Sequence, residues 1–416
     1  MSRYLITTTD ERTWKFDRPV LFLGEWCRLY GRKQVWSGMD AAVAEPYGLR
    51  PGQKERDVAY VQALSGQLLI ELTDALNAFH NTHHSLRYWN IVVGHWLHRF
   101  VAVMFNRYFT LEQALDQHEV SGSTVFDSIA YCLATSDSDT FGHACNDDVW
   151  NHVLYSKILS FSGRVKMDVD HASLRGVSGF TPANNSYATP NFNVKHSILN
   201  VASIFLPKFC RKCDAVIVNS GMPRKEEVKL LFSLGQFPQV WRSYPPKAVP
   251  PDREKRSLFD VGVDDYQGFE RFARCQLREI IPTCYLEGYD QLVQQANSLP
   301  WPTKPRFIFT AYNFGADEIF KAWAGSKIEE GIPYFVGQHG NNYGTHIYAG
   351  NPLWPERSTS DKFFTWGWVD ETPNVSPAII FRTVNRKSKR FAPKGGLLLI
   401  ESNNPPLIWP WDRYFE

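Results

Sequence analysis

The sequence predicts an α/β protein built on parallel strands. Residues 307–310 and 334–337 are short apolar runs that end in polar or glycine-containing turns, as buried strands do. Between them, residues 317–329 place apolar side chains at the 3.6-residue period of a helix, and Gly331 and Pro333 follow as stop signals. A strand, a helix and a second strand in this order form a βαβ unit, in which the two strands are parallel.

Other short apolar runs predict further strands. Each gives way to a polar or glycine-containing exit, which favours a position inside a sheet. These runs lie at residues 4–8, 20–24, 215–220 and 361–368.

A long helical segment separates the first strands from the later ones. From residue 60 to 79, and again from 88 to 108, apolar side chains recur at helical spacing on either side of the polar break 81–85. This pattern predicts a helical hairpin, and further helical pieces extend it to an insertion at about residues 58–165. A loop-rich tract follows at residues 164–193.

A chain of 416 residues is long enough for two domains. We expect an N-terminal α/β domain at residues 1–390, Rossmann-like and with a parallel sheet. After a basic run, residues 396–400 have the pattern of the first strand of another α/β domain. Residues 391–416 are therefore interpreted as a linker and the beginning of a truncated second Rossmann-like half.

Charge and composition disfavour several classes of function. The formal net charge of +2 provides no basic field for nucleic acid, so no nucleic-acid partner is expected. Seven cysteines at irregular spacing predict free thiols in a reducing compartment. No metal is expected, because neither the Cys-x-x-Cys motif at 210–213 nor the histidines His80, His83 and His84 have further ligands at standard spacing.

The chain shows no pattern of a leader peptide or a membrane span. Polar residues resume directly after the first few positions, and the most apolar long stretch, residues 88–109, is interrupted by charged and polar side chains. We therefore expect a cytoplasmic protein. The aromatic content of 14% suits deep packing, and it also suits stacking on sugar rings.

We expect the active site in the loop that follows residues 334–337. Its glycines, among them Gly340 and Gly344, let backbone amides approach a ligand closely, and such loops cradle phosphate or carboxylate oxygens. Gln338 can donate and accept hydrogen bonds, while His339 can act as acid, base or cationic anchor near neutral pH. In open α/β sheets, ligands bind outside the carboxyl ends of the strands. The loop therefore suits an anionic ligand.

Three carboxylates near strand ends and one arginine complete the candidates. Glu25, Glu356 and Asp361 could each serve as base or nucleophile, and spacing does not choose among them. Each also has a structural interpretation, as a surface residue, a salt-bridge partner and a cap at a strand start, respectively. Arg87 opens the second helix of the hairpin, where its guanidinium could hold a carboxylate or phosphate.

Several short motifs, spread from the first strand to the last residues, are read together. They are Phe22-Leu23-Gly24-Glu25-Trp26-Cys27, Leu76-Asn77 with His80, Arg87-Tyr88-Trp89, Leu286-Glu287-Gly288-Tyr289, residues 317–323, Gly337-Gln338-His339-Gly340, Tyr343-Gly344, Glu356, Ser360-Asp361-Lys362 and Thr365-Trp366-Gly367-Trp368. In combination they resemble a bacterial family of O-antigen and surface-polysaccharide transferases. The combination is far more specific than any single motif.

This resemblance implies a glycosyltransferase with two Rossmann-like halves, the GT-B arrangement. It is distantly similar to enzymes that transfer acidic keto-sugars such as Kdo from CMP-activated donors. The resemblance implies a nucleotide-sugar donor as substrate, no separate cofactor, and a glycan or lipid-linked glycan acceptor used at the inner face of the inner membrane through peripheral association. Family members continue past residue 416, so the isolated chain is expected to lack part of the donor site.

The resemblance also assigns roles to residues of this sequence. The catalytic candidates are His339, Glu356, Asp361 and Glu25. Asn341 stands where the family usually has a second glycine, which limits backbone freedom at that point. The substrate-binding candidates are Gln338, Gly340, Asn341, Tyr343, Gly344 and Arg87.

Two other functions are left open by the sequence. A non-catalytic glycan- or nucleotide-binding module of a polysaccharide assembly system would place Glu25, Glu356 and His339 on different faces. A hydrolase using His339 with a serine is less favoured, because the chain contains no Gly-x-Ser-x-Gly nucleophile motif.

Overall fold

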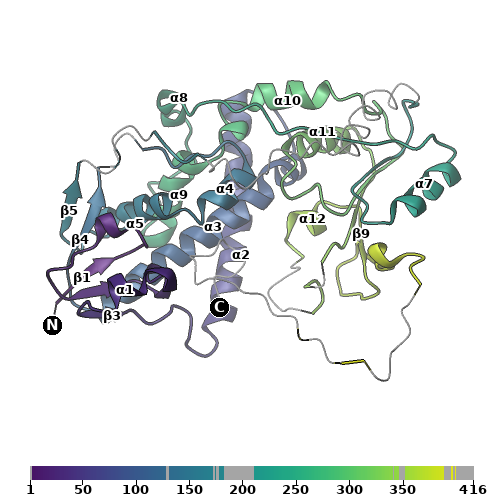
Figure 1. Ribbon diagram of the computed structural model, residues 1–416. Helices are drawn as coiled ribbons and strands as arrows, with labels where there is room; N and C mark the ends of the chain where they lie inside the picture. Colours follow the sequence, from purple (N-terminus) through teal and green to yellow (C-terminus); the bar gives the residue numbers. More distant parts are fainter. Residues whose placement is uncertain are drawn as a thin grey trace, which may run out of the picture.

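In the described part of the chain, the parallel strands form two separate five-stranded sheets. The computed structural model describes residues 2–127, 131–171, 174, 178–181, 210–340, 342–345, 352–387, 395–396 and 399. Figure 1 shows the two sheets on opposite sides of a long helical pair, α2 (Gln53–His80) and α3 (Leu86–Gln117). The predicted α/β class with parallel strands is confirmed. The sequence pattern did not show that the strands divide into two sheets, because it does not record which strands pair.

The first sheet has the strand order β3-β2-β1-β4-β5. β1 and β2 were predicted from the sequence, whereas β3 and β5 were not. β4 lies in a range for which only helices were expected. Its central residues are hydroxyl-bearing and not apolar, and they can be buried because they form hydrogen bonds within the sheet. Ser123 donates to the carbonyl of Leu5 at 3.1 Å, and Thr124 Oγ1 lies 2.9 Å from Tyr4 Oη. The strands are β1 (Arg3–Ile6), β2 (Val20–Phe22), β3 (Ala41–Val43), β4 (Val120–Phe126) and β5 (Met167–Asp170).

The second sheet has the order β10-β9-β8-β7-β6. β7, α11 (Glu318–Glu329) and β8 form the predicted βαβ unit, in which Asp317 caps α11 by accepting from the Phe320 N–H. The strand predicted at residues 396–400 lies largely outside the described residues. The strands are β6 (Val216–Val218), β7 (Ile308–Thr310), β8 (Tyr334–Gly337), β9 (Lys362–Thr365) and β10 (Val375–Pro377).

The predicted helical hairpin is confirmed. α2 ends at His80, where Asn81 takes a left-handed φ of 51° and its N–H donates to carbonyls of the last turn. Ser85 then caps α3 by accepting from the Tyr88 N–H. The other α-helices among the described residues are α1 (Lys33–Trp36), α4 (Ser138–Ala144), α5 (Asp148–Ser162), α7 (Arg224–Ser233), α8 (Arg253–Ser257), α9 (Gly268–Ile280), α10 (Tyr289–Asn297) and α12 (Pro355–Ser358).

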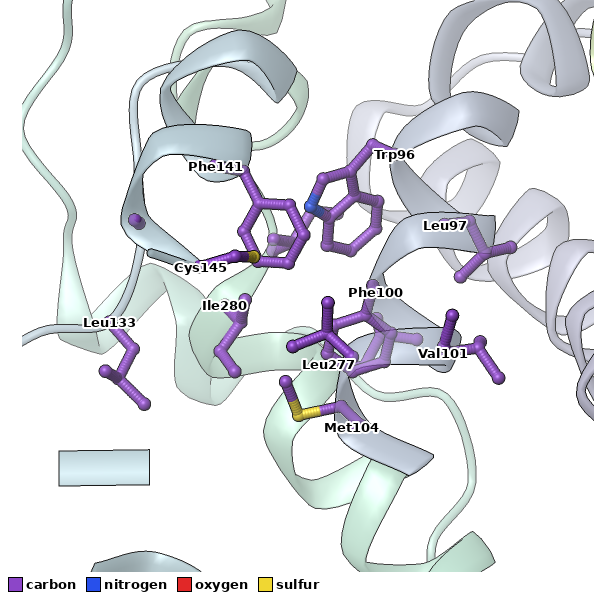
Figure 2. Packing of buried hydrophobic residues seen from close by; sticks show 14 of the residues in the cluster. Trp96, Leu97, Phe100, Val101, Met104, Leu133, Phe141, Cys145, Leu277 and Ile280 are labelled. Carbon is purple, nitrogen blue, oxygen red and sulfur yellow. The ribbon is translucent and has the colours of Figure 1, made fainter. Parts of the chain in front are cut away.

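Helix α3 packs against elements of both halves of the molecule. It contacts α4, α5 and α9 on the side of the first sheet, and α11 and α12 on the side of the second. Figure 2 shows Trp96, Phe100 and Met104 of α3 gathered with Phe141 of α4 and Leu277 of α9 in one apolar cluster. These side chains are almost completely buried, so α3 is the centre of the core.

A buried charge network ties α11 to α4. The Lys321 ammonium lies 2.7 Å from Glu318 Oε2 and donates to the Tyr285 hydroxyl at 2.9 Å. Tyr285 in turn donates to Glu318 Oε2 at 2.6 Å, and the Ser138 hydroxyl donates to the other carboxylate oxygen. Because Lys321 and Glu318 are at most 1% exposed, each charge depends on the other to compensate for lost hydration.

Candidate functional site

The carboxyl end of β8 brings a histidine to a cluster of polar and aromatic side chains. His339 follows β8, and Tyr312 and Phe314 follow the neighbouring strand β7. The His339 ring lies 5.4 Å from the ring of Tyr312 and 5.5 Å from that of Phe314, measured between centroids. The loop thus lies at the sheet edge where ligands bind in open α/β sheets.

Glu356 joins this cluster from α12. The hydroxyl of Tyr343 donates to Glu356 Oε1 at 2.6 Å, and the same hydroxyl oxygen lies 3.4 Å from Nδ1 of His339. Tyr343 therefore connects the carboxylate to the imidazole. The structure thus brings Glu356 together with two predicted residues of the loop, His339 and Tyr343.

His95 of α3 completes the cluster on the other side of Glu356. Its Nε2 lies 3.1 Å from Glu356 Oε2, and its ring stacks on Phe314 with a centroid separation of 5.3 Å. Within the described residues, neither Nε2 of His95 nor Oε2 of Glu356 makes a hydrogen bond, so the pair is close without hydrogen-bonding geometry. Glu356 is only 1% exposed, and a buried carboxylate oxygen in this state has unused acceptor capacity.

A glycine on α3 allows this approach. A Cβ at Gly94 would lie 2.8 Å from Cγ of Pro355, closer than side chains pack. Pro355 is the first residue of α12 and precedes Glu356 directly. The absence of a side chain at Gly94 thus lets α12 sit close to α3, with Glu356 beside His95.

Burial and charge determine the protonation of these groups. Burial alone would raise the pKa of Glu356, but the electrostatic influence of His95 and the Tyr343 hydrogen bond outweigh it, and the pKa falls below its usual value. Burial lowers the pKa of His339, and His95 and Arg382 lower it further against the opposing effect of Glu356. Near neutral pH, Glu356 is therefore ionised and His339 is neutral.

The hydrogen-bond network also assigns the tautomer of His339. Tyr343 has one hydroxyl proton, and the short contact with Glu356 takes it. The Tyr343 oxygen can then only accept from His339, which places the imidazole proton on Nδ1. Nε2 of His339 keeps its lone pair, so the carboxylate, phenol and imidazole are arranged as a general base with an ionised support behind it.

The side chain of Gln338 is held by hydrogen bonds inside the loop. Its Oε1 accepts from the Trp366 N–H at 2.9 Å and from Trp368 Nε1 at 2.8 Å, while its Nε2 donates to the carbonyl of Gly340 at 2.6 Å. The side chain is 2% exposed. These contacts fix the loop to β9, so Gln338 positions His339; a role in binding substrate stays a prediction.

The remaining predicted residues lie apart from the cluster or support the loop. Gly340 has open space around its Cα, and Gly344 takes a left-handed φ of 73° with the Trp368 ring close by. Asn341 lies outside the described residues. Arg87 donates to the carbonyl of Thr359 at 2.9 Å and to Asp361 at 2.9 Å.

Asp361 and Glu25 are each placed away from His339. Asp361 precedes β9, at the amino end of that strand, and also accepts from the Tyr334 N–H at 2.8 Å. Glu25 follows β2 of the first sheet, where it is exposed and paired with Arg28. Among the carboxylate candidates, only Glu356 is connected to His339, and this connection runs through the hydroxyl of Tyr343.

The sequence patterns did not indicate a role for His95. It appeared only as a polar interruption of the apolar stripe of α3, in the same way as His98, which stacks on Trp354 and whose pKa is lowered to about 4 by burial. Two histidines three residues apart on one face of an otherwise apolar helix were the available signal. In the described part of the chain, no group of three or more His, Cys, Asp or Glu side chains could hold a metal ion.

The architecture is that of an α/β protein in which His339, Tyr343, Glu356 and His95 cluster at a sheet edge. The chain belongs to the LIC12162 family of transferases, whose sequence profile matches residues 3–412. No curated protein and no solved structure is significantly similar to the chain. None of the described helices combines the length and the apolar character that a membrane span requires.

Proposed function

We propose that the protein is a glycosyltransferase that uses His339 as general base. The single observation that carries the proposal is the connection of ionised Glu356 through Tyr343 to Nδ1 of His339, which leaves Nε2 as a proton acceptor. Membership of a transferase family requires a group donor and an acceptor. A neutral imidazole base is suited to activating an acceptor hydroxyl.

The transfer step follows from this arrangement. The acceptor hydroxyl loses its proton to Nε2 of His339 as its oxygen forms a bond to the anomeric carbon. The bond from that carbon to the donor phosphate breaks, and the nucleotide leaves with the electron pair. Glu356 stabilises the imidazolium that forms, and a single displacement of this kind inverts the anomeric configuration.

The donor we propose is a nucleotide-sugar, with a CMP-activated acidic keto-sugar as the first candidate. The acceptor would be a glycan or lipid-linked glycan of bacterial O-antigen, lipopolysaccharide or other surface polysaccharide, reached at the cytoplasmic face of the inner membrane. These assignments rest on the family resemblance of the motifs. The donor is a substrate, and the proposed step uses no other cofactor.

The experiment is a donor screen with mass-spectrometric detection of products. The full chain is incubated with a panel of nucleotide-sugars and glycan acceptors, and the wild type is expected to consume one donor class. His339→Ala should lower turnover by about 10²–10⁴-fold, the usual contribution of a general base. His171→Ala, at an exposed histidine beside the first sheet, is the matched control and should keep wild-type turnover.

Unchanged turnover in His339→Ala would refute the proposed base. The second candidate function, a non-catalytic glycan- or nucleotide-binding module, predicts a different outcome, in which the wild type binds a donor without consuming it. The convergence of His339 and Glu356 favours the enzyme, and of the three residues only Glu25 lies apart, as the binding module would have it.

A further inference from the structure

A cavity of about 530 Å³ lies beside the first sheet, away from the His339 cluster. Its walls come from the end of β4, the start of β5, and helices α5, α8 and α9. None of these elements supplies a side chain to the candidate active site. The volume is in the range of small-molecule sites in proteins, which lies between about 300 and 1,000 Å³.

The floor of the cavity is apolar. Val125 and Phe126 of β4, Met167 of β5 and the ring of Tyr131 line it, and all except Met167 are buried. Surfaces of this kind favour an aliphatic or aromatic group, because its burial removes apolar area from water.

The walls of the cavity are cationic. Lys157, Arg253, Arg256 and Arg278 line it, against one carboxylate among the lining residues, Glu279. One of these cations is compensated by the carboxylate, since Lys157 forms an ion pair with Glu279 at 2.9 Å. Arg256 is likewise paired with Glu287, so the positive charge that remains at the cavity is above all that of Arg278, and it favours an anion.

The cations have different structural roles. Arg256 is 5% exposed and is held by Glu287 at 2.6 Å and by the carbonyl of Ile281 at 2.9 Å, so it belongs to the fold. The Arg278 side chain is exposed at the cavity, and no hydrogen bond or ion pair of its guanidinium occurs within the described residues. Arg278 is therefore available to pair with a ligand carboxylate or phosphate, the groups that its planar fork fits.

We propose that this cavity is a second ligand site, for a small organic anion that joins a phosphate or carboxylate to an aromatic or aliphatic group. The anionic group pairs with Arg278 at the entrance, and the apolar group rests on Val125 and Phe126. This site goes beyond the proposed transfer reaction, and its occupation does not depend on His339.

Isothermal titration of the full chain with three probes tests the ligand class. Phenyl phosphate and benzoate carry both features, with a different anion in each, and inorganic phosphate carries the charge alone. At least one organic anion should bind saturably, and more tightly than inorganic phosphate. The absence of saturable binding by both organic anions, or equal binding of inorganic phosphate, would overturn the proposal.

Two variants test the location. Arg278→Glu should weaken binding of the organic anion by about tenfold or more, since a charge-assisted contact is replaced by repulsion. Arg271→Glu is the matched control, because Arg271 is exposed on the same helix and does not line the cavity, and it should leave affinity unchanged. Ser160→Trp, which fills the cavity from α5, should abolish binding.

Protection of Cys132 gives a readout that needs no variant. Cys132 lines the cavity and Cys213 is exposed elsewhere. The bound probe should slow modification of Cys132 by N-ethylmaleimide at least severalfold and leave Cys213 unaffected, as measured by peptide mass spectrometry. Equal binding by wild type, Arg278→Glu and Ser160→Trp, with unprotected Cys132, would place the anion elsewhere and refute the site.

Discussion

Replacing Glu318 by glutamine should destabilise the protein strongly. In the native structure the Glu318 carboxylate is the counter-charge of Lys321, and both side chains are at most 1% exposed. Glu318→Gln removes the negative charge but leaves the ammonium buried. A buried charge deprived of its partner costs about 3–5 kcal/mol, so the free energy of unfolding should fall by that amount.

The same helix supplies a control. Lys327 and Glu330 form an ion pair with the same three-residue spacing and the same 2.7 Å separation, but Glu330 is 45% exposed. Glu330→Gln should change the free energy of unfolding by less than about 0.5 kcal/mol, because water replaces the lost partner.

Urea titrations of the wild type and both variants measure these differences. The double replacement Glu318→Gln with Lys321→Met should recover a large part of the loss, since it removes the uncompensated cation. A loss below about 1 kcal/mol in Glu318→Gln, or one equal to that of Glu330→Gln, would refute the reasoning that burial makes the network interdependent.

Three further outcomes are expected. Tyr343→Phe should lower turnover by about 10–100-fold with the fold intact by circular dichroism, because a buried donor to Glu356 is lost. Burial lowers the pKa of His152 to about 4, so on acidification the unfolded chain binds a proton at this histidine before the folded chain does. The free energy of unfolding should therefore fall by about 3 kcal/mol between pH 6.5 and pH 4 because of His152 alone. In urea titrations, His152→Gln should show an acid-induced loss that is smaller by this amount. Gly94→Ala should lower the free energy of unfolding by about 1–3 kcal/mol and reduce turnover, because the added methyl group displaces α12. Gly66→Ala, in open space on α2, should instead stabilise the protein by up to about 1 kcal/mol. A similar effect of both variants in thermal unfolding would contradict this explanation.

Local sequence patterns predicted those helices and strands whose buried side chains are apolar. The βαβ unit around α11, the hairpin of α2 and α3, and strands β1 and β2 all have such patterns. β4 could not be predicted in this way, because Ser123 and Thr124 are buried through hydrogen bonds to other strands, and those partners are distant in sequence.

The candidate site could be predicted in part for a similar reason. His339 and Tyr343 share one glycine-containing loop, so the sequence places them together. The contribution of His95 depends on how α3 packs against α12, which no local pattern reports. Likewise, Arg87 and Asp361 are 274 positions apart, so their spacing in the sequence could not show that the guanidinium of Arg87 donates to the carboxylate of Asp361.

The position of α3 has a consequence for dividing the molecule. One continuous apolar cluster contains Leu5 and Phe22 of the first sheet, Trp96 of α3, and Ile308 and Val336 of the second sheet. If the chain were cut between the sheets, the fragment that keeps α3 would expose the apolar side chains that α11 and α12 cover in the intact protein. The fragment with the second sheet would lose the apolar side chains of α3 that it packs against. Neither sheet is therefore a self-sufficient folding unit, and fragments expressed separately should be insoluble or should regain their structure only when combined.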